Sequence, residues 1–193
     1  MEKKGIKKSI KIVITGPESS GKTTLFEQLR TLSGFNFIPE YSRTYLEKID
    51  RPYHYNDILQ IAKQYVKELE ILNKNRLSVI SDTDLLTLQI WCEYKFQKCH
   101  PFIIENIKLN PPDLYLICSP NIPWEFDPQR ENPKDRIELF NIHLNKIKEM
   151  GVNMLITGGK TKASYSDKTN FYYFILYLLS MDIFNVENLS TYD

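Results

Sequence analysis

The sequence predicts an α/β protein with a mainly parallel, five-stranded sheet and helices on both of its faces. Two observations predict this class. Short, β-branched apolar runs alternate with longer segments in which apolar residues recur every three or four positions, and polar residues follow several of the short runs directly. Strands that alternate with helices need crossover connections, which make the strands parallel and place helices on both faces. Ligands are then expected beyond the carboxyl ends of the strands.

The elements follow in a regular order. Strands are expected at 10–14, 35–38, 77–80, 114–118 and 152–157. Helices are expected at 23–32, 41–49, 55–76, 85–96 and 133–150. The apolar stretch 171–184 is too short to cross a membrane and contains Asp182, so it is expected to be a core helix.

Composition narrows the class of protein further. A chain of 193 residues suits one globular domain, so residues 1–193 are expected to form a single unit with a disordered tail at about 185–193. Its 25 basic and 24 acidic residues leave no overall field that would attract nucleic acid or an anionic membrane. Three cysteines without the spacing of a disulfide framework favour the reducing cytoplasm. Composition leaves the oligomeric state open.

One motif carries specific chemistry. Residues 16–23, GPESSGKT, match G-x-x-x-x-G-K-[ST] between the first expected strand and the first expected helix. The glycines let backbone N–H groups turn inward, and the helix N-terminus adds its positive dipole end. Lys22 is expected to reach the β- and γ-phosphates of ATP, and Thr23 to bind Mg²⁺. The sequence thus predicts a P-loop NTPase whose ATP contacts come from Gly16, Glu18, Ser19, Ser20, Gly21, Lys22, Thr23 and Thr24.

A P-loop alone leaves kinase, GTPase and regulatory ATPase open. Three later segments narrow the choice: 39–45 (PEYSRTY), 81–91 (SDTDLLTLQIW) and 123–133 (PWEFDPQRENP). In sequence and order they resemble the ribosylnicotinamide kinase domain of the NadR family, an AAA-type P-loop kinase domain of NAD metabolism. The resemblance runs from about residue 10 to residue 157. It implies that a nucleoside is the small-molecule substrate, with ATP phosphorylating nicotinamide riboside at its 5′-hydroxyl to give the mononucleotide.

The chain departs from the family in two places. Members often carry an adenylyltransferase domain before the kinase, whereas here the P-loop begins near the N-terminus, so a free-standing kinase is expected. After the last expected strand, residues 158–162 (GGKTK) are rich in lysine and lack the expected arginine. The adenine contacts are therefore left unassigned.

The resemblance also suggests roles for three carboxylates. Glu40, at the end of the second expected strand, is where similar kinases place a carboxylate near the acceptor hydroxyl, so it is a candidate base. Asp82, at the end of the third, competes for that role but is favoured as a Mg²⁺ ligand, with helix N-capping as the alternative. Asp84 is expected to bind ribose or to cap the helix that follows, and both roles can coexist.

Arg130 and Arg136 lie in a segment, about 123–137, that resembles the short arginine lid of nucleoside and nucleotide kinases. They are expected to clamp the transferred phosphoryl group, and the alternative is a solvated charged face. Trp124 in the same segment could cover a cationic nicotinamide ring or could simply anchor the lid to the core. The predicted catalytic set is Lys22, Glu40, Asp82, Arg130 and Arg136.

The predicted nucleoside site is Glu40, Tyr41, Arg43, Asp84, Trp124 and Asp127. Two of these residues have an equally good alternative, since Tyr41 could belong to the core and Arg43 could pair with a carboxylate. Trp91 lies among apolar residues in a helix and is expected to be core rather than ligand.

Two other functions fit the same motifs. One is another nucleoside or nucleotide kinase, with thymidine as the nearest alternative substrate. The other is a regulatory ATP-binding module that switches a partner with little catalysis of its own. A second, aromatic-lined pocket would distinguish a kinase from the regulatory module, because a switch has no evident need for such a pocket.

Overall fold

The computed structural model describes residues 9–30, 32, 34–49 and 51–157. Within them, five strands form one sheet in the order β2-β3-β1-β4-β5. Every pairing is parallel, which confirms the predicted sheet. The strands are β1 (Lys11–Thr15), β2 (Asn36–Ile38), β3 (Val79–Asp82), β4 (Leu114–Cys118) and β5 (Asn153–Thr157).

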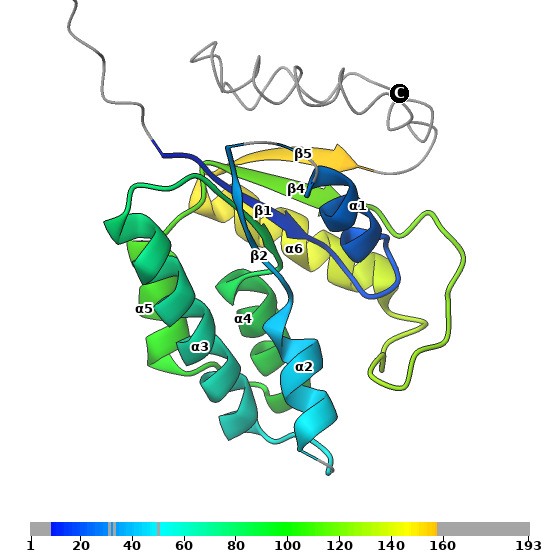
Figure 1. Ribbon diagram of the computed structural model, residues 1–193. Helices are drawn as coiled ribbons and strands as arrows, with labels where there is room; N and C mark the ends of the chain where they lie inside the picture. Colours follow the sequence, from blue (N-terminus) through cyan, green and yellow to red (C-terminus); the bar gives the residue numbers. More distant parts are fainter. Residues whose placement is uncertain (1–8, 31, 33, 50, 158–193) are drawn as a thin grey trace, which may run out of the picture.

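Six helices connect these strands among the described residues (Figure 1). They are α1 (Lys22–Leu29), α2 (Tyr41–Lys48), α3 (Tyr55–Lys74), α4 (Leu85–Phe96), α5 (Pro101–Leu109) and α6 (Arg136–Met150). The prediction was wrong in omitting α5. Its signals are a proline at the first helical position, a His100 side chain that accepts from the Phe102 N–H at 3.1 Å, and buried Ile103 and Ile107 four positions apart.

The two faces of the sheet are covered by different helices, as predicted. In the central strand β1, Ile12 and Ile14 pack with α1 on one face, while Val13 packs with α4 and α6 on the other. This alternation follows from the two-residue period of a strand. Figure 1 shows α1 and α6 on opposite sides of the sheet. Among the described residues the core comprises three apolar clusters: one between α1 and the sheet, one between the sheet, α4 and α6, and one around α3 with α4 and α5.

The order in which the chain adds strands to the sheet reverses direction at β1. From β1 it goes out to β2 at one edge, returns to β3, and then passes β1 to reach β4. The connections after β1 and β3 thus begin on adjacent strands, at the same carboxyl edge. In open parallel sheets, ligands bind where the strand order reverses in this way.

The turn between α2 and α3 is held by a buried carboxylate. Asp57 accepts hydrogen bonds from the Arg51 guanidinium at 2.8 and 2.9 Å, from the Tyr45 hydroxyl at 2.9 Å and from the His54 N–H at 2.7 Å. These donors, with Arg51 first, hold the pKa of Asp57 well below its usual range. The carboxylate thereby ties the start of α3 to α2 and to the turn between them.

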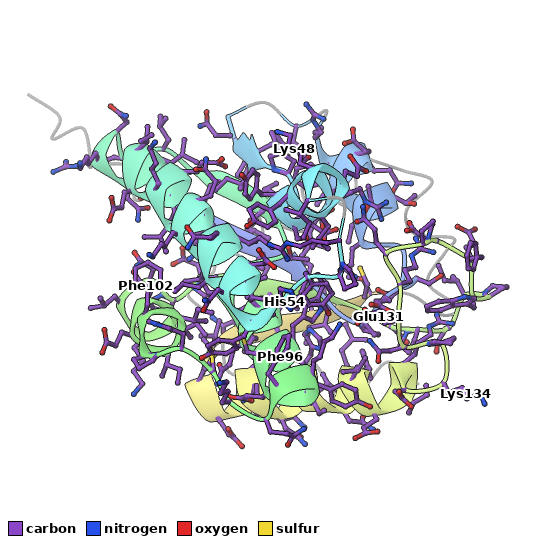
Figure 2. All side chains as sticks on the ribbon, turned by 90° about the horizontal axis from the view of Figure 1, so that it is seen from below. Lys48, His54, Phe96, Phe102, Glu131 and Lys134 are labelled. Atoms are coloured by element: carbon purple, nitrogen blue, oxygen red, sulfur yellow. The ribbon has the colours of Figure 1, made fainter. Side chains whose placement is uncertain are left out.

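Aromatic packing joins this turn to the end of α4. The rings of Tyr53 and Tyr55 meet Phe96 edge-on, with centroids 6.3 and 5.8 Å apart. Figure 2 shows His54, at the start of α3, close to Phe96 at the end of α4. The contact places Tyr53 beside α4, on the same side as the P-loop mouth described below.

The expected core helix at 171–184, the lysine-rich segment 158–162 and the expected tail at 185–193 lie outside the described residues. In the part of the chain that the structure describes, none of the helices has the length and apolar character needed to cross a membrane.

Candidate active site

The P-loop follows β1 and wraps around the N-terminus of α1. Gly16 has φ of +131°, and a Cβ at this position would lie 2.6 Å from the carbonyl oxygen of Cys118 on β4, so only glycine fits. Gly21, with φ of +89°, precedes α1 as its N-cap residue. The Ser20 hydroxyl donates to the Pro17 carbonyl at 2.8 Å and closes the loop on itself. The result is the anion cradle that the sequence predicts.

The two side chains that the motif adds to the cradle make different contacts. Lys22 Nζ donates to the Pro17 carbonyl oxygen at 2.8 Å, so the ammonium group lies over the loop. Thr23 Oγ1 donates to Asp82 Oδ2 at 3.3 Å, which joins the start of α1 to the end of β3. Two predicted site residues, 59 positions apart, are thus in contact.

Asp82 has the environment of a metal ligand. It is 3% exposed, and its Oδ1 has no hydrogen-bond partner among the described residues. Burial first, and then the negative charge of Glu40, raises the pKa of Asp82 to about 6. An orphaned carboxylate oxygen beside a hydroxyl suits Mg²⁺, which prefers oxygen ligands and keeps several from water and nucleotide phosphates. Thr23 and Asp82 therefore fit the predicted Mg²⁺ site.

A metal centre made wholly from side chains is a different arrangement. Among the described residues, no group of three or more His, Cys, Asp or Glu side chains is placed to hold a metal ion. A Mg²⁺ ion at Thr23 and Asp82 would accordingly take its remaining ligands from water and phosphate.

The P-loop opens into a cavity of about 380 Å³. Its walls are the P-loop, the start of α2, Tyr53 in the α2–α3 turn, one side of α4, the loop between β4 and α6, and the second turn of α6. This volume lies in the range of small-molecule sites. The cavity therefore has a phosphate-binding half at the P-loop and a second half between α2, α4 and the β4–α6 loop.

Glu40 lies where these two halves meet. It precedes α2, lines the cavity, and accepts a hydrogen bond from the Ser42 hydroxyl at 2.7 Å. The negative charge of Glu40 contributes to the raised pKa of Asp82. The structure thus brings the two predicted carboxylates to one place above the P-loop.

The predicted lid covers the P-loop through its two arginines. Arg130 Nη1 donates to the Glu125 carbonyl at 2.6 Å and to the Ser19 hydroxyl at 3.3 Å, and it lines the cavity. Arg136 Nη2 donates to the carbonyls of Ser19, Pro120 and Ile122 at 2.8, 3.0 and 2.9 Å. Arg130 is therefore placed to meet a ligand, whereas Arg136 ties the P-loop to the loop after β4.

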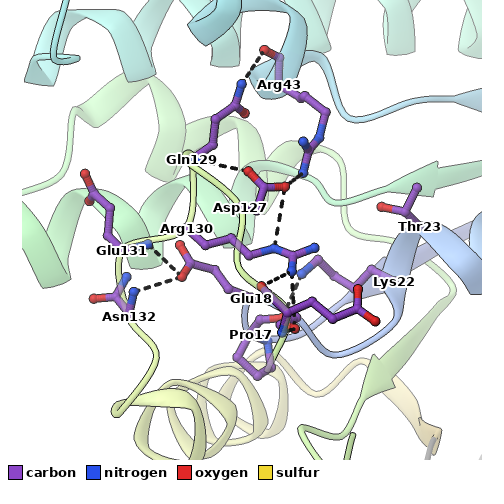
Figure 3. A network of polar contacts seen from close by, with 12 residues as sticks. Pro17, Glu18, Lys22, Thr23, Arg43, Asp127, Gln129, Arg130, Glu131 and Asn132 are labelled. Carbon is purple, nitrogen blue, oxygen red and sulfur yellow. Dashed lines mark hydrogen bonds and ion pairs between the residues drawn. The ribbon is translucent and has the colours of Figure 1, made fainter. Parts of the chain in front are cut away.

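A residue of the P-loop itself also holds the lid. Glu18 Oε2 accepts the backbone N–H groups of Glu131 and Asn132 at 3.0 and 2.9 Å. Figure 3 shows this carboxylate reaching across to the lid backbone, with Arg130 above the loop. The side chain of Glu18, predicted as an ATP contact, is thus committed to the lid in this structure.

A second set of lid contacts reaches α2. Asp127 pairs with Arg43 at 2.9 Å, and Gln129 Nε2 donates to the Arg43 carbonyl at 3.4 Å (Figure 3). The sequence predicts two roles equally for Arg43, a nucleoside contact or a carboxylate partner. The carboxylate partner is found, and Arg43 also lines the cavity. The lid therefore bridges the P-loop and α2.

Four of the predicted nucleoside-binding residues are not among the described residues that line the cavity: Tyr41, Asp84, Trp124 and Asp127. Tyr41 packs against the core cluster of α3. Asp84 caps α4, accepting from the Leu86 N–H at 3.0 Å and the Tyr115 hydroxyl at 2.8 Å, so both of its oxygens are engaged. The ring of Trp124 lies about 6 Å from the guanidinium carbons of both lid arginines.

Sequence reasoning missed the aromatic wall of the second half. Trp91, expected in the core, is half-buried and lines the cavity with Tyr53, whose ring centroid is 6.3 Å away at an interplanar angle of 30°. Lys95 Nζ lies 3.7 Å from the Tyr53 centroid and 2.9 Å from Glu131 of the lid. The signal available in the sequence was spacing, since Thr87, Trp91 and Tyr94 recur every three or four residues on one side of α4.

Comparison with known proteins agrees with this geometry. Residues 11–166 match a family model described as an AAA domain. The chain belongs to this AAA domain family. It is also 29% identical over 152 residues to the trifunctional NAD biosynthesis/regulator protein NadR of Escherichia coli strain K12, a match that covers 75% of this chain and 37% of NadR. The chain thus spans little more than a third of this relative, and the predicted resemblance to the NadR family is confirmed.

Solved structures show where this AAA domain stands among folds. A NadR protein in complex with NR superimposes with a TM-score of 0.65 at 22% identity, over 79% of this chain and 44% of that one. A NadR structure with NAD and AMP-PNP gives 0.63 at 21%, over 80% and 45%. Thymidylate kinase from Ehrlichia chaffeensis gives 0.58 at 16%, over 89% and 98%. At these identities the likeness establishes the fold, a P-loop kinase-like α/β domain.

Proposed function

We propose that this AAA domain transfers the γ-phosphoryl group of ATP to the 5′-hydroxyl of nicotinamide riboside and so makes nicotinamide mononucleotide for NAD salvage. One observation carries the proposal. The P-loop and an aromatic-walled second half share one cavity of about 380 Å³, and Glu40 lines it at their junction. A module that only senses ATP has no use for the second half, whereas a kinase must hold two substrates at once.

The donor side would work through charge and position. Lys22 would leave the Pro17 carbonyl, 2.8 Å away, for the β- and γ-phosphates, and Arg130 is held at the loop by Ser19 and Glu125. Thr23 and Asp82 would hold Mg²⁺, which would supply positive charge to offset that of the ATP phosphates. The Glu18–lid hydrogen bonds would keep water away from the phosphoryl group.

The acceptor side would supply a base. Glu40 is half-buried, is oriented by the Ser42 hydroxyl at 2.7 Å, and stands on the cavity wall. Asp82 is joined to Thr23 instead and belongs to the metal side. Glu40 would therefore accept the proton of the 5′-hydroxyl as that oxygen attacks the γ-phosphorus.

The aromatic wall would select a cationic base. Tyr53 already carries an ammonium group, that of Lys95, 3.7 Å from its ring centre. A nicotinamide ring bears the same positive charge and is flat, so Trp91, and Tyr53 once Lys95 has moved away towards Glu131, would give it both stacking and cation–π attraction. Trp124, predicted for this role, lies against the two lid arginines and would act through them. The NadR relatives, one of them solved with NR, support this choice of substrate.

The test is a substrate panel. Purified protein is incubated with Mg-ATP and, separately, nicotinamide riboside, thymidine and uridine, and both ADP and the nucleoside monophosphate are measured. We expect equal amounts of ADP and nicotinamide mononucleotide. The proposal fails if nicotinamide riboside gives no ADP above background. Strong turnover of thymidine would assign the domain to another nucleoside kinase, and nucleotide-dependent partner binding without turnover would assign it to a regulatory module.

A further inference from the structure

One buried polar atom, in a residue that lines the cavity, has no role in the mechanism above. His143 lies in the second turn of α6, is 3% exposed, and lines the cavity with Leu139. Its Nδ1 lies 2.7 Å from the Leu139 carbonyl oxygen, and its Nε2 has no hydrogen-bond partner among the described residues. Buried polar atoms in folded proteins nearly always have a partner, so this nitrogen calls for an explanation.

The hydrogen bond to Leu139 fixes what Nε2 can do. A carbonyl oxygen only accepts, so Nδ1 must carry the hydrogen, and the neutral ring then presents Nε2 as a bare acceptor. Burial, with a smaller effect from the charge of Lys22, lowers the pKa of His143 to about 4. At neutral pH the ring therefore stays uncharged, and Nε2 can accept a hydrogen bond but cannot donate one.

The rest of the cavity limits where a donor to Nε2 can come from. Lys22 Nζ donates to the Pro17 carbonyl and is the group expected to turn to the phosphates, and the hydroxyl of Thr87 is paired with that of Thr15 at 3.1 Å, where either oxygen can be the donor. The phosphates that the P-loop is built to hold carry oxygens that accept hydrogen bonds, so they cannot satisfy a bare acceptor. Of the groups that a bound phosphate and a bound nucleoside would bring to the cavity, the neutral donors belong to the nucleoside.

We propose that His143 is a positioning residue for the acceptor nucleoside, and that its Nε2 accepts a hydrogen bond from a neutral donor, a carboxamide N–H or a ribose O–H. The inference rests on the proposed function and adds a selection rule to it. A nucleoside with a carboxylate in place of the carboxamide offers no hydrogen and brings negative charge to an acceptor, so it is disfavoured if the carboxamide is the donor.

The test compares two variants. His143→Phe keeps a ring and removes the acceptor, whereas His143→Gln keeps an acceptor oxygen. Initial rates are measured with nicotinamide riboside, nicotinate riboside and the 2′- and 3′-deoxy forms of nicotinamide riboside. We expect the KM for nicotinamide riboside to rise about 10-fold in His143→Phe, the loss of one hydrogen bond, with kcat and the KM for ATP within about twofold of the original protein. His143→Gln is expected to recover part of the loss.

The nucleoside panel identifies the donor. If it is the carboxamide, the original protein prefers the amide over the acid by about 10-fold and His143→Phe loses that preference. If the donor is a ribose hydroxyl, one deoxy form binds the original protein weakly. The size of that loss does not exceed the loss that His143→Phe causes with nicotinamide riboside. Equal rises of the KM for ATP and for the nucleoside in both variants would overturn the inference and leave His143 as a packing residue.

A second readout separates this inference from the proposed function. The ¹⁵N chemical shift of His143 Nε2 is followed while nicotinamide riboside, and separately ATP, is added to the protein. A shift on adding the nucleoside, moving in the direction of an accepted hydrogen bond, supports the inference even where the panel shows no turnover. No shift with the nucleoside, or the same shift with ATP alone, contradicts it.

Discussion

The two halves of the cavity are built in different ways. The phosphate-binding half comes almost entirely from one contiguous segment, residues 16–24, and much of its chemistry lies in backbone N–H groups around Gly16 and Gly21. The acceptor half is assembled from α2, the α2–α3 turn, α4, the lid and α6, and its chemistry lies in side chains. In the proposed function the first half would serve any nucleoside triphosphate, and the second would decide what receives the phosphoryl group.

This difference predicts how each half responds to substitution. Changes in the phosphate-binding half should lower the rate with every acceptor, because they act on the group being transferred. Changes in the acceptor half should act mainly on the KM for one nucleoside. The predictions that follow test this division, from the largest expected effect to the smallest.

Lys22→Ala removes the ammonium group that lies over the P-loop, 2.8 Å from the Pro17 carbonyl. Phosphoryl transfer is expected to fall roughly 10³-fold with every nucleoside, because charge on the transferred group loses its main side-chain cation. The measurement is ADP formation at saturating nucleoside. Lys48→Ala, at the exposed end of α2, is the matched control and should leave the rate unchanged. A loss confined to one nucleoside would break the division between the halves.

Asp82→Asn is expected to separate activity from stability. Transfer should fall roughly 100-fold, since Mg²⁺ loses a charged ligand. The raised folded pKa of about 6 means that the folded protein keeps a proton that the unfolded chain has already lost between about pH 4 and pH 6. The free energy of unfolding therefore falls as pH rises through that window.

Above pH 6, removing this carboxyl should raise the free energy of unfolding of the nucleotide-free protein by on the order of 2 kcal/mol. Its melting temperature should rise accordingly. Thermal unfolding at pH 5 and at pH 8 checks it, and the gain should be larger at pH 8. Glu105→Gln, on the exposed side of α5, serves as the charge-matched control. A variant less stable than the original protein at pH 8 would contradict the assigned origin of the pKa shift.

Trp91→Ala and Trp124→Ala form a pair that separates the cavity wall from the lid. Trp91 lines the cavity beside Tyr53, so its loss should raise the KM for nicotinamide riboside about 10-fold and that for uridine less. Trp124 packs against Arg130 and Arg136, so its loss should lower kcat a few-fold with either nucleoside. The opposite assignment would restore Trp124 as the cover of the nicotinamide ring, the role predicted from the sequence.

Glu18→Ala tests the bond between the two halves. Without this carboxylate, the N–H groups of Glu131 and Asn132 lose their acceptor, and the lid should open more often. We expect faster amide hydrogen exchange at both residues and a few-fold rise in ATP hydrolysis without nucleoside, because water reaches the phosphoryl group. Glu27→Ala, exposed on α1, is the control. Unchanged exchange at 131 and 132 would show that other contacts hold the lid.

The carboxylates at the end of β3 show how far sequence reasoning reached. Asp82 and Asp84 are two residues apart and both follow an apolar run, so the pattern could offer each the same roles. In the structure Asp82 meets Thr23, while Asp84 caps α4 and accepts from Tyr115 on β4. The intervening Thr83 has φ of +64°, a turn of the backbone that separates the two side chains and that no periodicity reveals.

The tryptophans make the same point for the acceptor half. Helix α4 is apolar on more than one side, since Leu86 and Ile90 pack on one cluster and Leu88 and Cys92 on another. Its periodicity alone therefore could not say whether Trp91 faced the core or a ligand. In the structure Trp91 does both: it packs beside the α3 cluster of the core and lines the cavity.

By itself the sequence determined the parallel sheet, the position of nearly every helix described here, and the P-loop of the phosphate-binding half, because these depend on residues close together in the chain and on backbone geometry. Tertiary structure decided most of the acceptor half, of whose lining residues the sequence predicted Glu40, Arg43 and Arg130. Glu18 reaches the lid backbone more than a hundred positions away, Arg43 finds Asp127 across 84, and His143 is left with an unpaired nitrogen. Contacts at such separations are set by how helices pack on the sheet, and short-range patterns do not contain that information.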